Sequence, residues 1–140
     1  MRKLGLALMI ANLVGAVVVT LWPFAFDLRP AAIARKWAHV EWVLYYRDDA
    51  GRVIIDRDLV LNLALLFPLG AGFAWWRVRR TWLLGWALGL GIVTATALEA
   101  AQLLTPHRVS QLADVWRNAL GCVIGALLGA ALRRRWPPSA

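Results

Sequence analysis

Residues 113–132 of the chain read ADVWRNALGCVIGALLGAAL. Apart from its first turns the stretch is apolar, and its length matches the roughly 20 residues that an α-helix needs to cross a hydrocarbon core of about 30 Å. Three arginines, Arg133, Arg134 and Arg135, follow it directly, as basic residues do at lipid headgroups. Because backbone polar groups cannot stay unpaired in lipid, the stretch is predicted to be a membrane-spanning helix.

Three further segments share this character: residues 4–22, 58–76 and 81–104. Of the whole sequence, 61% is hydrophobic. That share is too high for a soluble domain of 140 residues, because a small domain cannot bury so much apolar surface. We predict an all-α membrane protein, a single domain over residues 1–140 built as a bundle of four transmembrane helices. The continuous apolar pattern argues against a β-barrel, in which polar and apolar residues alternate.

The borders of these segments carry further marks of a membrane. Segment 4–22 follows Arg2 and Lys3 like a signal peptide, but it is longer than a typical signal region and no A-x-A-like site closes it. We interpret it as an uncleaved first helix. Tryptophans lie at or near the segment ends, where an aromatic belt is expected: Trp22, Trp75, Trp76, Trp82, Trp116 and Trp136.

The only long connection, residues 23–57, is predicted to be structured. Residues 29–42 favour an interfacial amphipathic helix with Trp37 and Trp42 in the headgroups. Beyond it, residues 41–47 and 52–56 are predicted to pair as a hairpin around a turn at 48–51, where Gly51 can adopt a positive φ.

Small residues and one proline predict how the helices pack. Gly121, Gly125 and Gly129 repeat every four residues, a spacing that allows close backbone contact between membrane helices. Gly85 and Gly89 repeat the pattern one helix earlier. We predict packing within the bundle, with homo-oligomerisation through the first three glycines as the alternative. Pro68 is predicted to kink the second helix.

Charge placement bears on partners and orientation. The net charge is +8, but the basic residues gather at the edges of apolar runs, which indicates contact with membrane lipids and not with nucleic acid. The numbers of basic residues on the two sides are tied. Clustering close to helix ends is denser on the side of the termini, so we predict that both termini are cytoplasmic.

Polar residues inside or beside the apolar segments form three pairs at helical spacing, each on one helical face: Asp58 with Asn62, Glu99 with Gln102, and Asp114 with Asn118. Antiparallel threading brings all three pairs into one leaflet, the outer one in the chosen orientation. A carboxylate in hydrocarbon is costly unless it is paired or wetted. We therefore expect Glu99 to be paired with Arg108 or Arg117, in a polar pocket roofed by residues 23–57.

Structural roles compete with this interpretation. Asp58 and Asp114 are suited to cap helix N-termini, and Asn62 and Asn118 to join helices. The single cysteine, Cys122, is expected to be a buried apolar side chain. His39 and His107 lack the spacing of metal ligands, so we expect no metal site and no cofactor, and the catalytic residues, if there are any, are unknown.

The ordered motifs resemble those of the VanZ-like family of small bacterial membrane proteins. They read Leu21-Trp22-Pro23-Phe24, then Asp58-x3-Asn62-x4-Phe67-Pro68-Leu69-Gly70, then Glu99-x2-Gln102-x5-Arg108-x5-Asp114-x3-Asn118-x2-Gly121. The resemblance implies an inner-membrane protein with a role at the cell envelope; the family's named member is associated with teicoplanin resistance. It implies no catalytic residues. By motif match it carries over, as ligand-binding positions, Asp58, Asn62, Glu99, Gln102, Arg108, Asp114 and Asn118.

Three functions stay open at this point. The leading one is a non-enzymatic envelope protein that binds an amphiphile, a lipid-linked cell-wall precursor or a lipoglycopeptide, at the outer leaflet. The second is a membrane enzyme that acts on a lipid headgroup through its carboxylates, with or without a divalent metal. The third is a small oligomeric channel or transporter, for which the two halves show no inverted repeat.

Overall fold

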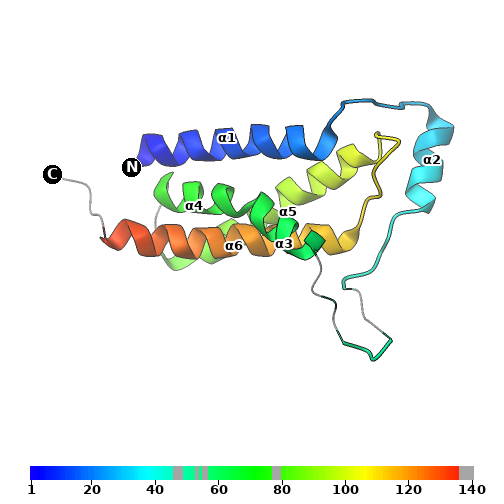
Figure 1. Ribbon diagram of the computed structural model, residues 1–140. Coiled ribbons are helices and arrows are strands. Elements are labelled where there is room, and N and C mark those ends of the chain that lie inside the picture. Colours follow the sequence, from blue (N-terminus) through cyan, green and yellow to red (C-terminus); the bar gives the residue numbers. More distant parts are fainter. Residues whose placement is uncertain (46–48, 53, 55–56, 77–79, 136–140) are drawn as a thin grey trace.

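The computed structural model describes residues 1–45, 49–52, 54, 57–76 and 80–135 (Figure 1). Its elements, in chain order, are α1 (Arg2–Leu21), α2 (Pro30–Ala38), α3 (Arg57–Leu65), α4 (Phe67–Trp76), the 3-10 helix η1 (Arg80–Trp82), α5 (Leu83–Gln102) and α6 (Leu112–Arg135). No strand occurs in this described part of the chain. The predicted all-α class is confirmed.

Four helical stretches are long and apolar enough to cross a membrane: α1, α3 with α4, α5, and α6. They lie side by side, and α2 crosses one end of the bundle (Figure 1). The start of α1 and the end of α6 lie together at the opposite end. The chain is therefore a four-span membrane protein, with spans close to the predicted ranges.

The second span is broken where the sequence predicted a kink. Helix α3 ends at Leu65 and α4 begins at Phe67. Pro68 has no amide hydrogen, and its ring clashes with the preceding turn of a regular helix. Asn12 of α1 donates its side-chain amide to the Leu65 carbonyl oxygen over 2.9 Å. A polar side chain of the neighbouring span thus serves a carbonyl at the break, as is common where membrane helices are interrupted.

Helix α6 packs tightly against this broken span. A Cβ atom built on Gly121 would lie 2.0 Å from the Leu63 carbonyl oxygen, and one on Gly125 would lie 1.9 Å from that of Phe67. At Gly129 the distance to the Ala71 carbonyl oxygen would be 2.8 Å. Contacts this short require glycine, so the glycine stripe of α6 is covered inside the chain.

Helix α5 has three glycines. A Cβ atom on Gly91 would lie 2.8 Å from the Ala119 Cα atom of α6, whereas Gly85 and Gly89 are placed differently. A Cβ atom on Gly85 or Gly89 would meet nothing within 4 Å, so the spacing that they share with the α6 glycines does not produce close packing within the chain.

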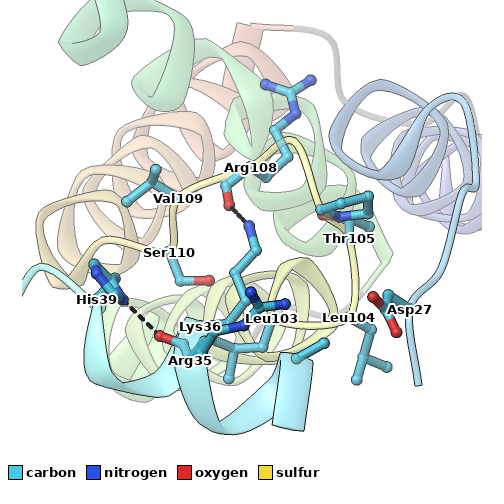
Figure 2. A pocket seen from close by; sticks show the side chains of 12 residues that line it. Asp27, Arg35, Lys36, His39, Leu103, Leu104, Thr105, Arg108, Val109 and Ser110 are labelled. Atoms are coloured by element: carbon cyan, nitrogen blue, oxygen red, sulfur yellow. Dashed lines mark hydrogen bonds between the residues drawn. The ribbon is translucent and has the colours of Figure 1, made fainter. Parts of the chain in front are cut away.

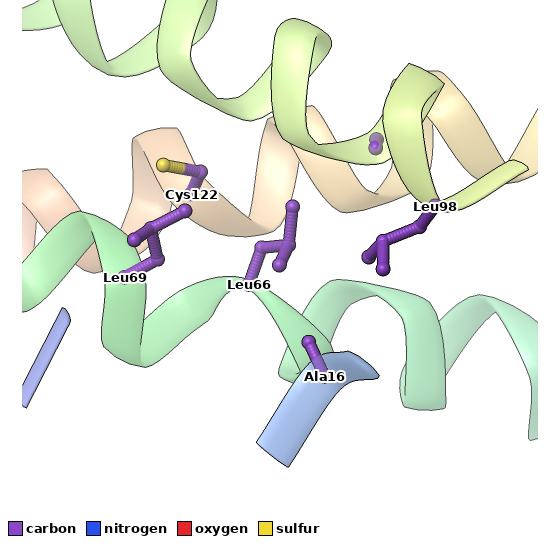
Figure 3. Packing of buried hydrophobic residues seen from close by; sticks show 6 residues of the cluster. Ala16, Leu66, Leu69, Leu98 and Cys122 are labelled. Carbon is purple, nitrogen blue, oxygen red and sulfur yellow. The ribbon is translucent and has the colours of Figure 1, made fainter. Parts of the chain in front are cut away.

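All four spans contribute to one buried apolar cluster (Figure 3). Ala16 comes from α1, Leu66 and Leu69 from the broken span, Leu98 from α5 and Cys122 from α6. Leu66, Leu69 and Cys122 are fully buried. Cys122 thus has the apolar environment expected of it.

Residues 23–45 are tied to the loop between α5 and α6. The amide of Asp27 donates to the Leu104 carbonyl oxygen over 2.8 Å. Further along, the Glu41 amide donates to the Ser110 carbonyl oxygen over 3.1 Å, and the Leu112 amide donates to that of Glu41 over 2.9 Å. This parallel bridge of Glu41 with Gln111 connects the long loop to the start of α6.

The helix predicted within residues 29–42 is α2, which is shorter than expected; its location at the membrane interface stays a prediction. The predicted hairpin has no described pairing: its first residue, Glu41, is bridged to Gln111, and residues 46–48, 53 and 55–56 lie outside the described residues. Gly51 has the predicted positive φ, +77°.

Candidate functional site

The end of the bundle under α2 holds the buried acidic residue that the sequence singled out. Glu99, in the last turn of α5, is 9% exposed. Its Oε2 atom accepts a hydrogen bond from the Gln111 backbone amide over 2.9 Å, and the Ser110 hydroxyl donates to the Glu99 carbonyl oxygen over 3.0 Å. The carboxylate is thus held by a backbone amide, which differs from the predicted pairing with Arg108 or Arg117.

Arg108 instead stabilises the end of the first span. Its guanidinium donates to the Val19 carbonyl oxygen over 3.2 Å. In a regular helix that oxygen would receive the amide of the residue four positions on, but this residue is Pro23, which has no amide hydrogen. Arg108 therefore replaces a hydrogen bond that the chain itself cannot make.

A polar network joins α3 to α6. The Asn118 side-chain amide lies 3.4 Å from the Asn62 side-chain oxygen, and Asn62 also bonds the Asp114 carboxylate. The Asp114 carboxylate accepts from Arg117 over 3.3 Å, and Arg117 is 2% exposed. These contacts match the helix-joining role that competed with ligand binding. Within the described residues, the buried side-chain oxygen of Asn118 has no hydrogen-bond partner.

The last two predicted positions, Asp58 and Gln102, have simpler surroundings. Asp58 is exposed, in the first turn of α3, and Asp114 occupies the first turn of α6. Both carboxylates are favourable there because a helix N-terminus is partially positive, although neither stands at the capping position. Gln102 is buried at the end of α5.

An exposed ion pair joins Asp27 to Arg29, directly before α2 begins. The Asp27 carboxylate accepts hydrogen bonds from Arg29 over 2.9 and 2.6 Å. These bonds stabilise the ionised form, and they lower the pKa of Asp27 to about 2.

Two hollows lie at this end of the bundle. One is between α2 and the loop after α5, and the other is between residues 37–42 and the facing parts of α5 and α6. The first, the basic pocket, has a volume of about 410 Å³ and is walled by α2 residues and by the 103–110 loop. The ammonium group of Lys36 crosses this pocket to donate to the Arg108 carbonyl oxygen (Figure 2). The polar lining residues are Asp27, Arg35, Lys36, His39, Thr105, Arg108 and Ser110.

The second hollow, the tryptophan groove, has a volume of about 200 Å³ and an almost wholly apolar lining. Trp37 and Trp42 form one side, with ring centroids 5.6 Å apart in an edge-to-face arrangement. Glu99 is among its lining residues. Leu103 and Ser110 line both hollows, so the two spaces adjoin across these residues.

The sequence foresaw only part of this lining. Of the seven predicted positions, Arg108 lines the basic pocket and Glu99 lines the groove, whereas the other five are not among the lining residues. Arg35, Lys36 and His39 were missed as pocket residues. Their signal was present, because they lie on the amphipathic segment, but the sequence does not say which loop that segment covers.

The described residues contain no group of three His, Cys, Asp or Glu side chains suited to a metal ion. Taken together, the fold and the hollows define a four-span α-helical membrane protein with a polar and an apolar hollow at one end of the bundle. The VanZ/LLP1 family model matches residues 9–133, and the chain belongs to this family. No curated protein and no solved structure matches it. The resemblance drawn from the motifs is thereby confirmed.

Proposed function

We propose that this VanZ-like protein acts at the cell envelope by binding an amphiphile beneath α2, without catalysing a reaction. The observation that carries the proposal is the shared wall of the two hollows. Leu103 and Ser110 line both the basic pocket and the tryptophan groove. A molecule with a charged head and an apolar chain can therefore place each part in matching surroundings.

The chemistry of the two linings supports this division. Arg35 and Lys36 offer cationic donors in the basic pocket, and charge-assisted hydrogen bonds to anionic groups are among the strongest that side chains make. The groove offers Trp37, Trp42 and Val115 to an apolar chain. Of the family-motif residues, Arg108 lines the basic pocket and Glu99 lines the groove. We expect the others to support the walls: Asp58, Asn62, Gln102, Asp114 and Asn118.

The proposed orientation places the site in the outer leaflet of the bacterial inner membrane. Basic residues gather at the other end of the bundle, where Arg2 and Lys3 begin α1 and Arg133, Arg134 and Arg135 end α6. This clustering near helix ends favours a cytoplasmic location for that end. The ligands that fit an outer-leaflet site are a lipid-linked wall precursor or a lipoglycopeptide.

Photolabelling tests the proposal. The protein is placed in nanodiscs with a phospholipid that carries a diazirine in its acyl chain, and labelled peptides are identified by mass spectrometry. We expect labelling at the tryptophan groove that a lipid-linked wall precursor or teicoplanin reduces. Trp86, which is 69% exposed on α5, reports non-specific contact with bulk lipid and should not respond to either competitor.

A matched pair of variants gives the test its control. Ala100 lines the groove, so Ala100→Trp should fill it and abolish the competable labelling. Ala97, also exposed on α5, is not among the lining residues, so Ala97→Trp should leave that labelling unchanged. Equal labelling of both variants and of the wild type would refute binding in the groove.

A further inference from the structure

The charged lining of the basic pocket identifies the head of the ligand. Resting on the proposed function, we propose that this pocket binds a phosphate group, and that the ligand is a phosphate-bearing amphiphile. Two neighbouring residues of α2, Arg35 and Lys36, line the pocket with cationic side chains. The only acidic lining residue in the described part of the chain is Asp27.

The negative charge of Asp27 is already compensated from outside the pocket. Its carboxylate is bonded through both oxygens to Arg29, which is not a lining residue. Arg35 also attracts this carboxylate, but Arg29 acts on it more strongly, so Asp27 is neutralised chiefly by Arg29 and not by the two cations of α2. Arg108 also lines the pocket, but its guanidinium is directed away from the centre and toward α1, where it binds the Val19 carbonyl oxygen, so the cationic donors of the pocket are those of α2 (Figure 2).

Lys36 shows that a donor already reaches the middle of the pocket. Its ammonium group donates to the Arg108 carbonyl oxygen on the opposite wall (Figure 2). Lysine has three such donors on a flexible stem, so it can turn to an incoming anion without a change in the backbone. The hydroxyl of Ser110, on the wall shared with the groove, marks the place where the head of the ligand continues into its chain.

Charge balance favours phosphate over carboxylate. A phosphate monoester carries a charge of about −1.5 to −2 at neutral pH, which matches the two cations of α2. A carboxylate carries one negative charge and would leave one of these cations uncompensated. The volume of about 410 Å³ also leaves room for part of the group that the phosphate esterifies.

Headgroup selectivity in nanodiscs tests this assignment. Affinity is measured for phosphatidic acid and for a fatty acid, each diluted in phosphatidylcholine, with inorganic phosphate added as a competitor in a separate arm. We expect wild-type protein to prefer phosphatidic acid by about ten-fold or more, the ratio expected when one charge-assisted contact is lost. Equal affinity for the two lipids would overturn the assignment.

Charge-removing variants locate the binding. Lys36→Gln and Arg35→Gln should each weaken phosphatidic acid binding about ten-fold. Lys36→Arg keeps the positive charge and should bind phosphatidic acid like the wild type. This comparison distinguishes loss of charge from a shift in the position of α2. Arg57→Gln removes an exposed charge at the same end of the bundle, outside the pocket, and should have little effect. Equal losses in Arg57→Gln and Lys36→Gln would show only diffuse attraction and refute the site.

The outcomes separate this inference from the proposed function. Unselective lipid binding that Ala100→Trp still abolishes would refute the phosphate assignment and leave amphiphile binding intact. Binding of inorganic phosphate that depends on Lys36, with photolabelling indifferent to Ala100→Trp, would support the phosphate assignment and refute the amphiphile. Preference for phosphatidic acid together with loss in Ala100→Trp supports both.

Discussion

Substituting Gly125 with alanine probes one of the closest backbone contacts between two spans. The added Cβ would lie 1.9 Å from the Phe67 carbonyl oxygen, whereas ordinary contact begins at 3.4 Å. Helix α6 and the broken span must therefore separate locally by about 1.5 Å, because a backbone carbonyl cannot rotate away as a side chain can. A radial gap of about 0.5–1 Å already forfeits a quarter to a half of the dispersion energy of each contact.

Two opposing terms set the magnitude. Overpacking of a well-packed interior costs about 1–3 kcal/mol, and a clash with backbone belongs at the upper end. Alanine gains about 1 kcal/mol over glycine in helix propensity. We expect Gly125→Ala to lower the free energy of unfolding by about 2 kcal/mol.

The assay is reversible unfolding in mixed detergent and SDS micelles, followed by circular dichroism. Gly89→Ala is the matched control, because its Cβ would meet nothing within 4 Å, so only the gain in helix propensity should remain. Equal stability of Gly125→Ala and Gly89→Ala would refute the interpretation that the α6 glycines are there for close packing within the chain.

Two further predictions concern one hydrogen bond between spans and one exposed ion pair. Asn12→Ala should lower the free energy of unfolding by about 1 kcal/mol, because the Leu65 carbonyl loses its side-chain donor and hydrogen bonds between membrane helices are of this magnitude. The same SDS titration measures this change in stability. Unchanged stability would contradict a role of Asn12 at the break. Arg29→Gln should raise the pKa of Asp27 from about 2 toward 3.8, as followed by carbon-detected NMR. Because the folded-state pKa is depressed, the ion pair stabilises the fold above about pH 3.8 and this contribution is lost as the pH falls toward 2; a pKa that Arg29→Gln leaves at about 2 would contradict this origin.

The four spans could be predicted because lipid imposes a simple rule on sequence. Each span needs about 20 apolar residues, and its backbone must be helical. The hydropathy of the sequence is therefore enough to predict where the spans lie. The kink was also predictable, because Pro68 lacks an amide hydrogen whatever its surroundings. The use of Asn12 at that kink was not, since its partner carbonyl belongs to another span.

The four-residue spacing of glycines did not by itself predict which helix faces pack closely. Gly121 and Gly85 stand in similar patterns, yet only the first would place a Cβ against a neighbouring backbone. A four-residue repeat shows that small residues share a face. It does not show whether that face turns toward another span, because helix rotation is set by all contacts of the bundle together.

The candidate site was predictable in its location and not in its lining. Antiparallel threading brings Asn62 and Asn118 into contact across two spans, as the sequence implied. Periodicity cannot distinguish polar residues that join helices from those that line a space. The basic pocket depends on where α2 lies, and this is fixed by loop contacts such as that of Lys36 with Arg108, which have no sequence period.

Glu99 connects a position that the sequence predicted with loop contacts that it did not predict. Its carboxylate holds the Gln111 amide and its carbonyl oxygen holds the Ser110 hydroxyl, while Glu41 of the long loop bonds Ser110 and Leu112 from the other side. Residues 110–112 are thus fixed between the end of α5 and the segment that follows α2. Ser110 lines both hollows, so Glu99 holds, through its carbonyl oxygen and its carboxylate, a loop segment that the basic pocket and the tryptophan groove share. Burying a carboxylate costs free energy, and the hydrogen bond from the Gln111 amide offsets part of this cost. The same hydrogen bond holds the loop that contains Gln111.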